Sequence, residues 1–171
     1  MRTIKGDLIT LALQGEFDVI THGCNIFCTM GAGIAPQMAR AFEADKFVME
    51  NQQFRGDVNK LGTIDYETQY VKNGASHSIP PNDYKFQLTV VNAYTQINYG
   101  RNHSDGDMIP FDYAAFEVIL KKMAHTFKGQ RIGLPRIGSG LGGGDEQRIE
   151  LLIRKFLAPH CDVTIVEWDK N

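Results

Sequence analysis

Two polar stretches of the chain hold the side chains that could do chemistry. The first comprises residues 22–25, His-Gly-Cys-Asn, and residues 30–35, Met-Gly-Ala-Gly-Ile-Ala. The imidazole of His22 titrates near neutral pH and could serve as a general acid or base. The second comprises residues 138–144, Gly-Ser-Gly-Leu-Gly-Gly-Gly, followed by Asp145. The Asp145 carboxylate could orient a water or pair with His22, and it is equally well placed to cap the helix that follows.

The first stretch lies where a strand is expected to end and a helix to begin. The apolar run 17–20 predicts a buried strand before it, and Ile34, Met38 and Phe42 share one face of a helix after it. Backbone N–H groups at the start of a helix are unpaired, and the helix dipole is positive there. We therefore expect this stretch to bind a phosphate group, with His22 at the mouth of the cleft.

The order of the expected elements predicts an α/β fold. The helix between Asp112 and Gly129 has an aspartate N-cap, a staple of Phe111 and Phe116, and a glycine stop. Because strands alternate with three helices, we expect a single domain over residues 1–171, a three-layer α/β/α sandwich with a mixed, largely parallel central sheet. Ligands of such sheets bind outside the carboxyl ends of the strands, where both glycine stretches fall. The strands are expected at 3–5, 17–21, 61–66, 86–94, 131–137 and 162–168, and the other helices at 33–44 and 146–157.

Composition narrows the class of protein. The chain has 171 residues, of which 43% are hydrophobic, enough for a globular core. Its formal net charge of −2 predicts no general attraction to nucleic acid or to anionic membranes. The N-terminus lacks the apolar core of a signal peptide, and no apolar run could span a bilayer. The three cysteines argue against a disulfide framework, and Cys24 and Cys28 have no second pair for a zinc site. We expect a cytoplasmic protein without metal or cofactor.

Four short motifs resemble those of macrodomains, the modules that bind ADP-ribose. They are Lys-Gly-Asp-Leu at 5–8, His-Gly-Cys-Asn at 22–25, Met-Gly-Ala-Gly-Ile-Ala at 30–35 and Leu-Pro-Arg-Ile-Gly-Ser-Gly-Leu at 134–141. The likeness covers nearly the whole chain, in the order and spacing of the family. The 30–35 loop is similar to that of the branch holding the yeast-type ADP-ribose 1″-phosphate phosphatases and the terminal ADP-ribose protein glycohydrolase.

The resemblance implies roles for the matching residues. Asp7 would accept a hydrogen bond from the adenine amino group, although it also reads as a simple turn aspartate. Asn25 would bind hydroxyls of the distal ribose. The amides of residues 31–34 and 139–142 would hold the diphosphate and distal ribose from two sides. The implied ligand-binding set is Asp7, Leu8, Asn25, Met30, Gly31, Ala32, Gly33, Ile34, Ala35, Tyr94, Gly138, Ser139, Gly140, Leu141, Gly142 and Trp168.

An aromatic residue often stacks on the ligand in macrodomains. Tyr94, Tyr99 and Trp168 lie at expected strand ends or in loops and are the candidates for this role. Each of them could instead pack into the core, since aromatic side chains bury a large area anywhere in a protein.

The chain departs from the terminal glycohydrolase at two positions. That enzyme uses a lysine on the strand that here reads Val-Val-Asn-Ala-Tyr at 90–94, and its aspartate directly follows Gly-x-Gly-Leu, where this chain has Gly142. The resemblance therefore favours a phosphatase that converts ADP-ribose 1″-phosphate to ADP-ribose. His22 would protonate the leaving ribose oxygen or orient the nucleophile, and Asp145 would activate water.

Two other functions stay open beside the phosphatase. One is a non-catalytic reader of ADP-ribose, and the other is a hydrolase that removes ADP-ribose from protein or nucleic acid. The expected partners are accordingly ADP-ribose, its 1″-phosphate and ADP-ribosylated macromolecules.

Overall fold

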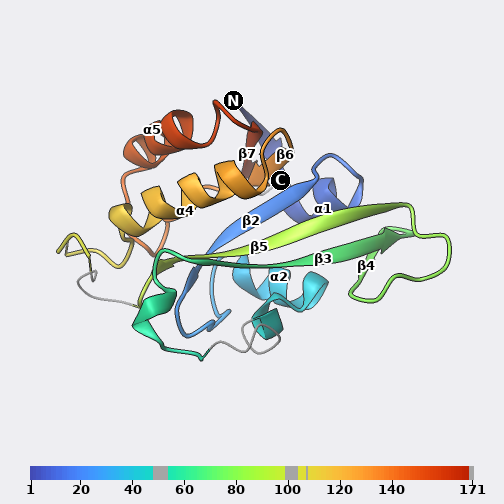
Figure 1. Ribbon diagram of the computed structural model, residues 1–171, viewed down its shortest axis with the longest axis horizontal. Helices are drawn as coiled ribbons and strands as arrows, with labels where there is room; N and C mark the ends of the chain where they lie inside the picture. The colour runs from blue at the N-terminus through green and yellow to red at the C-terminus, as the bar shows by residue number, and fades with distance from the viewer. Residues whose placement is uncertain (48–53, 99–103, 107, 170–171) are drawn as a thin grey trace.

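A seven-stranded sheet runs through the computed structural model, which describes residues 1–47, 54–98, 104–106 and 108–169 (Figure 1). The neighbouring strands β1, β7, β6, β2 and β5 are parallel, whereas β3 is antiparallel to β5 and to β4. The predicted mixed, largely parallel sheet is therefore confirmed. In spatial order, the strands are β1 (Arg2–Gly6), β7 (Asp162–Trp168), β6 (Arg131–Leu134), β2 (Val19–Asn25), β5 (Phe86–Gln96), β3 (Ile64–Lys72) and β4 (Ala75–His77).

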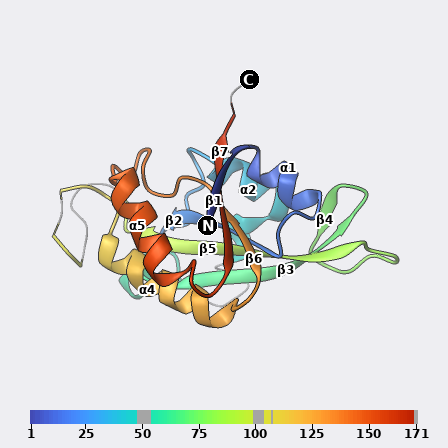
Figure 2. The same ribbon diagram turned by 90° about the horizontal axis from the view of Figure 1, so that it is seen from above.

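Helices cover both faces of this sheet (Figures 1 and 2). On one face, α4 (Tyr113–Thr126) and α5 (Glu146–Phe156) enclose a large apolar core. On the other face, α1 (Leu8–Leu13) and α2 (Ala35–Phe42) enclose a second one. Two short 3₁₀ turns, η1 (Ala44–Lys46) and η2 (Val58–Lys60), flank the segment after α2. The predicted three-layer α/β/α sandwich is confirmed.

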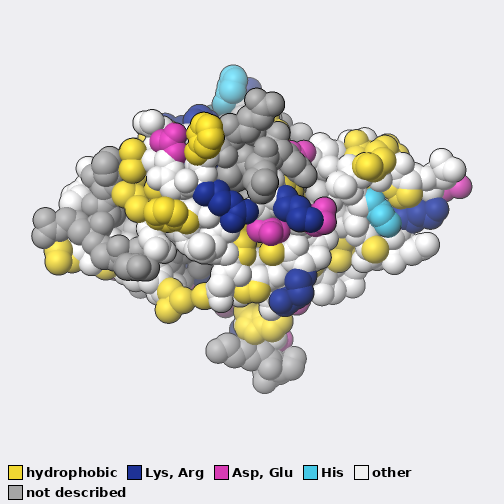
Figure 3. Space-filling view, turned by 90° about the horizontal axis from the view of Figure 1, so that it is seen from below, with side chains coloured by type: hydrophobic (Ala, Val, Ile, Leu, Met, Phe, Trp, Pro, Cys, Tyr) yellow, Lys and Arg dark blue, Asp and Glu magenta, His cyan; other side chains and the backbone are white. Residues whose placement is uncertain are grey.

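The surface on the α2 side is mixed in character. Seen from below, basic and acidic side chains lie next to one another near the centre of this face, with hydrophobic side chains between them (Figure 3). None of the helices in the described ranges is long and apolar enough to cross a membrane.

The helix α1 was not predicted. The apolar run that follows Asp7 forms it because the Asp7 carboxylate accepts a hydrogen bond from the Thr10 backbone N–H at 3.0 Å and so caps its first turn. Leu8 and Ala12 then point into the core beneath the sheet. Asp7 is thus the N-cap of α1, and the N-terminus of this helix lies next to the carboxyl end of β1.

The strand β2 runs further than predicted. It was expected to end at residue 21, but it continues to Asn25 and pairs with β5 through His22 and Cys24. A polar residue such as His22 can stay in a buried strand because a side chain on the neighbouring strand accepts its hydrogen bond. The predicted loop therefore begins only after Asn25.

The helices around the second glycine stretch agree with their predicted signals. Asp112 caps α4 by accepting a hydrogen bond from the Ala115 N–H at 2.9 Å, and the rings of Phe111 and Phe116 lie 5.4 Å apart as the expected staple. Asp145 caps α5, so its predicted capping role is confirmed. These two helix starts hold the second glycine stretch between them.

Candidate functional site

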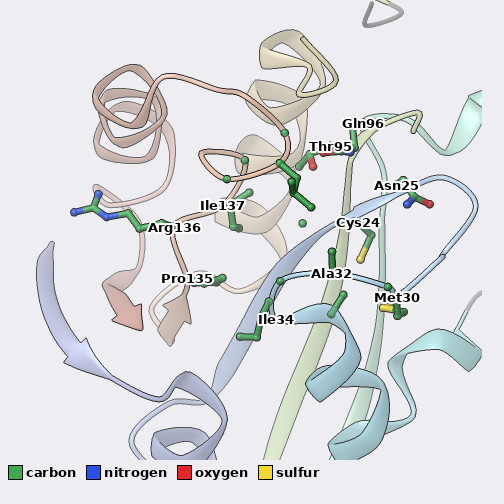
Figure 4. A pocket seen from close by; sticks show the side chains of 18 of the residues that line it. Cys24, Asn25, Met30, Ala32, Ile34, Thr95, Gln96, Pro135, Arg136 and Ile137 are labelled. Atoms are coloured by element: carbon green, nitrogen blue, oxygen red, sulfur yellow. The ribbon is translucent and has the colours of Figure 1, made fainter. Parts of the chain in front are cut away.

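A cleft with a cavity volume of about 890 Å³ crosses the carboxyl ends of the parallel strands (Figure 4). Neighbouring strands are about 4.8 Å apart, so the four steps from β1 to β5 give the cleft a length of roughly 19 Å. At the β1–β7 end, its walls are apolar and include Leu8, Val166 and Trp168. At the β2–β5 end, they are polar and uncharged, with Asn25, Gln96 and Asn98. The two glycine stretches line the middle.

The first glycine loop, residues 30–34, brings free amides to the cleft. Within the part of the chain that the structure describes, the backbone N–H groups of this loop donate no hydrogen bond. The loop leads into α2, whose N-cap Ile34 has no capping side chain and whose first turn contains Pro36. The unpaired amides and the positive end of the helix dipole thus meet at one wall of the cleft.

The second glycine loop, residues 138–144, is a closed turn. The Gly144 N–H donates to the Gly138 carbonyl at 2.8 Å, and the Gly143 N–H donates to the Gly140 carbonyl at 3.0 Å. By contrast, the amides of residues 138–142 donate to no other described residue. Both loops therefore offer unpaired donors to a ligand in the cleft, which is the arrangement that binds anions.

The glycines of the two loops fall into two groups. A Cβ added at Gly138 would lie 2.3 Å from the Phe111 ring, and one at Gly144 would lie 2.8 Å from the end of Ile149 and 3.0 Å from the Gly138 carbonyl oxygen, so packing favours glycine at both positions. A Cβ added at Gly31 or Gly140 would meet no described atom within 4 Å, and neither residue has a left-handed φ. No contact with a described residue and no backbone angle requires glycine at Gly31 and Gly140, and both line the cavity.

Asn25 holds the turn that leads into the first glycine loop. Its Oδ1 accepts hydrogen bonds from the N–H groups of Phe27 and Thr29 at 3.0 and 3.3 Å, and its Nδ2 donates to the Thr29 hydroxyl at 2.7 Å. The side chain lines the cavity (Figure 4). Its binding of a ribose remains a prediction.

His22 lies beneath the cleft, so its predicted position at the mouth is wrong. Its side chain is 0% exposed and does not line the cavity. The Asn92 Nδ2 donates to the Ala44 carbonyl at 2.8 Å, which leaves Asn92 Oδ1 to accept from His22 Nε2 at 2.7 Å. Burial lowers the pKa of His22 to about 4, although the bond to Asn92 raises it. His22 is therefore neutral at pH 7 and has no direct path to a ligand.

Tyr94 is also a core residue, and the prediction that it stacks on a ligand is wrong. It is 0% exposed, and its hydroxyl donates to Asp65 Oδ2 at 2.6 Å. The same carboxylate oxygen lies 3.1 Å from Lys60 Nζ, and that ammonium lies 4.2 Å from the Tyr94 ring centroid. Burial, followed by the bond to Asp65, raises the pKa of the Tyr94 phenol. Trp168, in contrast, lines the cavity and is 57% exposed.

Three further predicted residues stand beside the cavity without lining it. The Asp7 carboxylate caps α1, and the Ser139 hydroxyl donates to the Arg136 carbonyl at 3.2 Å. Asp145 Oδ1 accepts from the N–H groups of Gln147 and Arg148 at 2.8 and 3.1 Å. Their roles toward a ligand remain predictions. The predicted residues that do line the cavity are Leu8, Asn25, Met30, Gly31, Ala32, Gly33, Ile34, Ala35, Gly138, Gly140, Leu141, Gly142 and Trp168.

A phage protein is a sequence relative of the chain. No protein-family model matches it. It is 30% identical over 177 residues to the uncharacterized 17.5 kDa protein in the tk-vs intergenic region of Enterobacteria phage T4, with 99% of this chain and 97% of that protein covered. The chain belongs to the same family as this T4 protein.

Solved structures identify the fold. A macrodomain protein from Streptomyces coelicolor matches with a TM-score of 0.60 and 20% identity, covering 99% of both chains. The fold is a macrodomain. A Bacteroides thetaiotaomicron protein matches the chain with a TM-score of 0.68 and 25% identity, over 98% of this chain and 99% of that one. Thermosipho africanus DarTG, solved in complex with ADP-ribose, matches with a TM-score of 0.68 and 14% identity, over 96% of this chain and 40% of that one.

Several residues of the macrodomain cleft were not predicted. Cys24 and Cys28, first considered as metal ligands, line its floor as free thiols, and burial raises the pKa of both. Gln96 ends β5 and Asn98 follows it, so both line the cavity at the carboxyl edge of the sheet, a position that the predicted strand over 86–94 already implied. Tyr99, the third predicted stacking residue, lies outside the described residues.

Proposed function

We propose that the cleft binds ADP-ribose or a derivative of it. The apolar end at Leu8, Val166 and Trp168 suits a flat purine, because aromatic and aliphatic side chains bury its two faces. The unpaired amides of the two glycine loops suit a diphosphate in the middle. The neutral polar end at Asn25 and Gln96 suits sugar hydroxyls. The roughly 19 Å cleft thus presents three chemically distinct sections in the order of base, diphosphate and ribose.

The observation that carries the proposal is the space left at Gly31 and Gly140. A glycine that no contact and no backbone angle requires, in a loop of unpaired amides, leaves room for a ligand to approach the main chain. Solved neighbours support the identity of that ligand, since the Thermosipho africanus DarTG structure and a Trypanosoma brucei macrodomain structure are complexes with ADP-ribose.

Titration of the purified protein tests this proposal directly. Trp168 is the single tryptophan of the chain and lines the cavity, so its fluorescence reports on the apolar end of the cleft. We expect saturable binding of ADP-ribose, with weaker binding of ADP and of ribose 5-phosphate, because each of these fills only part of the cleft. Calorimetry that detects no binding of ADP-ribose at millimolar concentration would refute the proposal.

We propose hydrolysis of ADP-ribose 1″-phosphate as a second function, with Asp145 as the residue that activates water. The Asp145 carboxylate would take a proton from a water whose oxygen bonds to phosphorus. The bond from phosphorus to the distal ribose oxygen would break, and that oxygen would receive the proton from Asp145 through solvent. While Asp145 Oδ1 caps α5, its Oδ2 accepts no hydrogen bond from another described residue, so this oxygen is available to a water molecule. Asp145 also ends the second glycine loop, whose amides could stabilise charge on the phosphoryl group. His22 is not assigned a role in this proposal, because its side chain is 0% exposed and does not line the cavity.

The Asp145→Asn variant separates this activity from binding. Asparagine caps a helix about as well as aspartate, so the variant should fold and bind ADP-ribose normally. Release of phosphate from ADP-ribose 1″-phosphate should fall to background. Unchanged release would rule out Asp145 as the base. If the wild-type protein binds but releases neither phosphate nor ADP-ribose from a modified protein or nucleic acid, the domain is a reader.

A further inference from the structure

Arg136 is the one charged side chain among the described residues that line the cleft. It follows the end of β6 and precedes the second glycine loop. Its guanidinium meets three carboxylates: Nε lies 2.7 Å from Glu146, Nη1 lies 2.9 Å from Glu150, and Nη2 lies 2.6 Å from Glu167. Although burial opposes it, the bonds to Glu167 and Glu150 raise the pKa of Arg136.

This arginine is not placed to hold a phosphate. Each of its three nitrogens already has a carboxylate partner, and its side chain is only 23% exposed. Figure 4 shows the side chain pointing away from the other labelled residues of the cavity. Arg136 can therefore affect a ligand only through the elements that it joins, α5 and β7.

The pair with Glu146 closes the base of the second glycine loop. Arg136 stands two residues before the loop and Glu146 two residues after it, as the first residue of α5. Two backbone contacts reinforce this closure: the Gly144 N–H donates to the Gly138 carbonyl at 2.8 Å, and the Asp145 N–H donates to the Tyr113 hydroxyl at 2.7 Å. Holding both ends of the loop limits the conformations that its amides can sample.

The pair with Glu167 ties this base to the apolar end of the cleft, where Trp168 lies. Glu167 directly precedes Trp168 in β7, and its Oε1 accepts bonds from both Nε and Nη2 of Arg136, at 3.1 and 2.6 Å. One guanidinium thus connects the loop that offers amides to the strand end that carries the exposed indole. Its planar fork allows this, whereas a lysine ammonium has no such geometry.

We propose that Arg136 is a positioning residue, which sets the second glycine loop and Trp168 in one arrangement before ligand arrives. This inference rests on the proposed binding of ADP-ribose. Preorganisation raises affinity because the bound ligand need not order the loop, and its loss should weaken ADP-ribose binding about tenfold. Without Arg136, the contributions of the second glycine loop and of Trp168 to ADP-ribose affinity should become independent of each other.

Arg136→Met and Arg131→Met form a matched pair of variants. Arg131 begins β6 and pairs with Asp18 through Nη2 at 2.8 Å, far from the cleft. In ligand-free protein, we expect Arg136→Met to raise the hydrogen exchange of amides 138–144 and to lower the fluorescence anisotropy of Trp168. Arg131→Met should change neither, and Arg136→Lys should restore only part of both. Glu146→Gln should raise the loop exchange alone, which provides a test if Arg136→Met does not fold.

A double-mutant cycle between Gly140→Ala and Trp168→Ala measures the coupling between the loop and the indole, which would not depend on Arg136 if this residue only stabilised the fold. The effects of the two changes on ADP-ribose affinity should be non-additive with Arg136 present and additive in the Arg136→Met background. Equal loop exchange and anisotropy in the two methionine variants would overturn the inference, as would additivity in both backgrounds. If the wild-type protein fails to bind ADP-ribose, the proposed function is wrong, and exchange and anisotropy still decide whether Arg136 orders the two elements.

Discussion

The Gly31→Ala variant should fold normally and lose affinity for ligand. A Cβ at Gly31 meets no described atom within 4 Å, and the residue has no left-handed φ. The methyl group therefore causes no strain, and removing a glycine from the unfolded chain stabilises the protein by about 0.4–1 kcal/mol. In the cleft, the methyl occupies space that a phosphate oxygen needs to reach the loop amides. Losing one hydrogen bond to a charged group costs about 1.5–3 kcal/mol, or roughly 10- to 150-fold in Kd.

The Gly138→Ala variant provides the opposite case in the second loop. Gly138 has a φ of +77°, and its added Cβ would lie 2.3 Å from the Phe111 ring. The left-handed backbone costs an alanine about 1–3 kcal/mol, and the overpacked ring costs about 1–3 kcal/mol more. We expect the free energy of unfolding to fall by about 2–6 kcal/mol.

Urea unfolding and calorimetry with ADP-ribose measure the two quantities on each variant. We expect a crossed result: Gly31→Ala has an unfolding midpoint equal to or slightly above that of the wild type and loses binding, whereas Gly138→Ala loses stability. Wild-type affinity in Gly31→Ala would refute the assignment of the first loop to the phosphate. An unfolding midpoint lowered by more than the error in Gly31→Ala would show that the space around this residue is not open.

Three further predictions concern stability and binding. The pKa of His22 is about 4 in the folded protein, against an ordinary histidine value of 6.5, so between these pH values only the unfolded chain takes up a proton. The free energy of unfolding should therefore be highest above about pH 6.5 and fall by about 3 kcal/mol toward pH 4, as measured by urea unfolding at stepped pH. Lys60→Met should remove the cation that pairs with the buried Asp65 carboxylate and lower the free energy of unfolding, measured in urea, by about 3–5 kcal/mol. Trp168→Ala should weaken ADP-ribose binding roughly 2- to 10-fold in calorimetry, because it removes an aromatic contact.

Each of these predictions has a control. A His22→Gln variant should lose the slope of stability between pH 4 and 6.5, and an unchanged slope would assign it to other groups. The double variant Lys60→Met, Asp65→Asn should recover much of the lost stability, and failure to recover would show that lost packing dominates. Equal affinity in wild type and Trp168→Ala would remove the indole from the binding site.

Much of the fold could be read from local signals. The capping aspartates Asp112 and Asp145, the Phe111–Phe116 staple and the strand over 162–168 depend on neighbours in sequence, and all agree with the structure. The glycine loops were predicted for the same reason, because a turn between a strand and a helix is a local event. The helix α1 was missed because its apolar run is only six residues long, too short to show a helical period.

The sequence by itself determined the two glycine loops and the order of the strands and helices apart from α1 and β4, and hence the edge of the sheet where the cleft lies. Only the tertiary structure decided which side chains enter that cleft. His22 and Tyr94 are polar residues whose partners, Asn92 and Asp65, stand on other strands, and these bonds let both be buried beneath the floor. The Arg136 cluster likewise joins residues from three separate elements. Burial and long-range pairing depend on contacts between distant segments, and no local pattern encodes them.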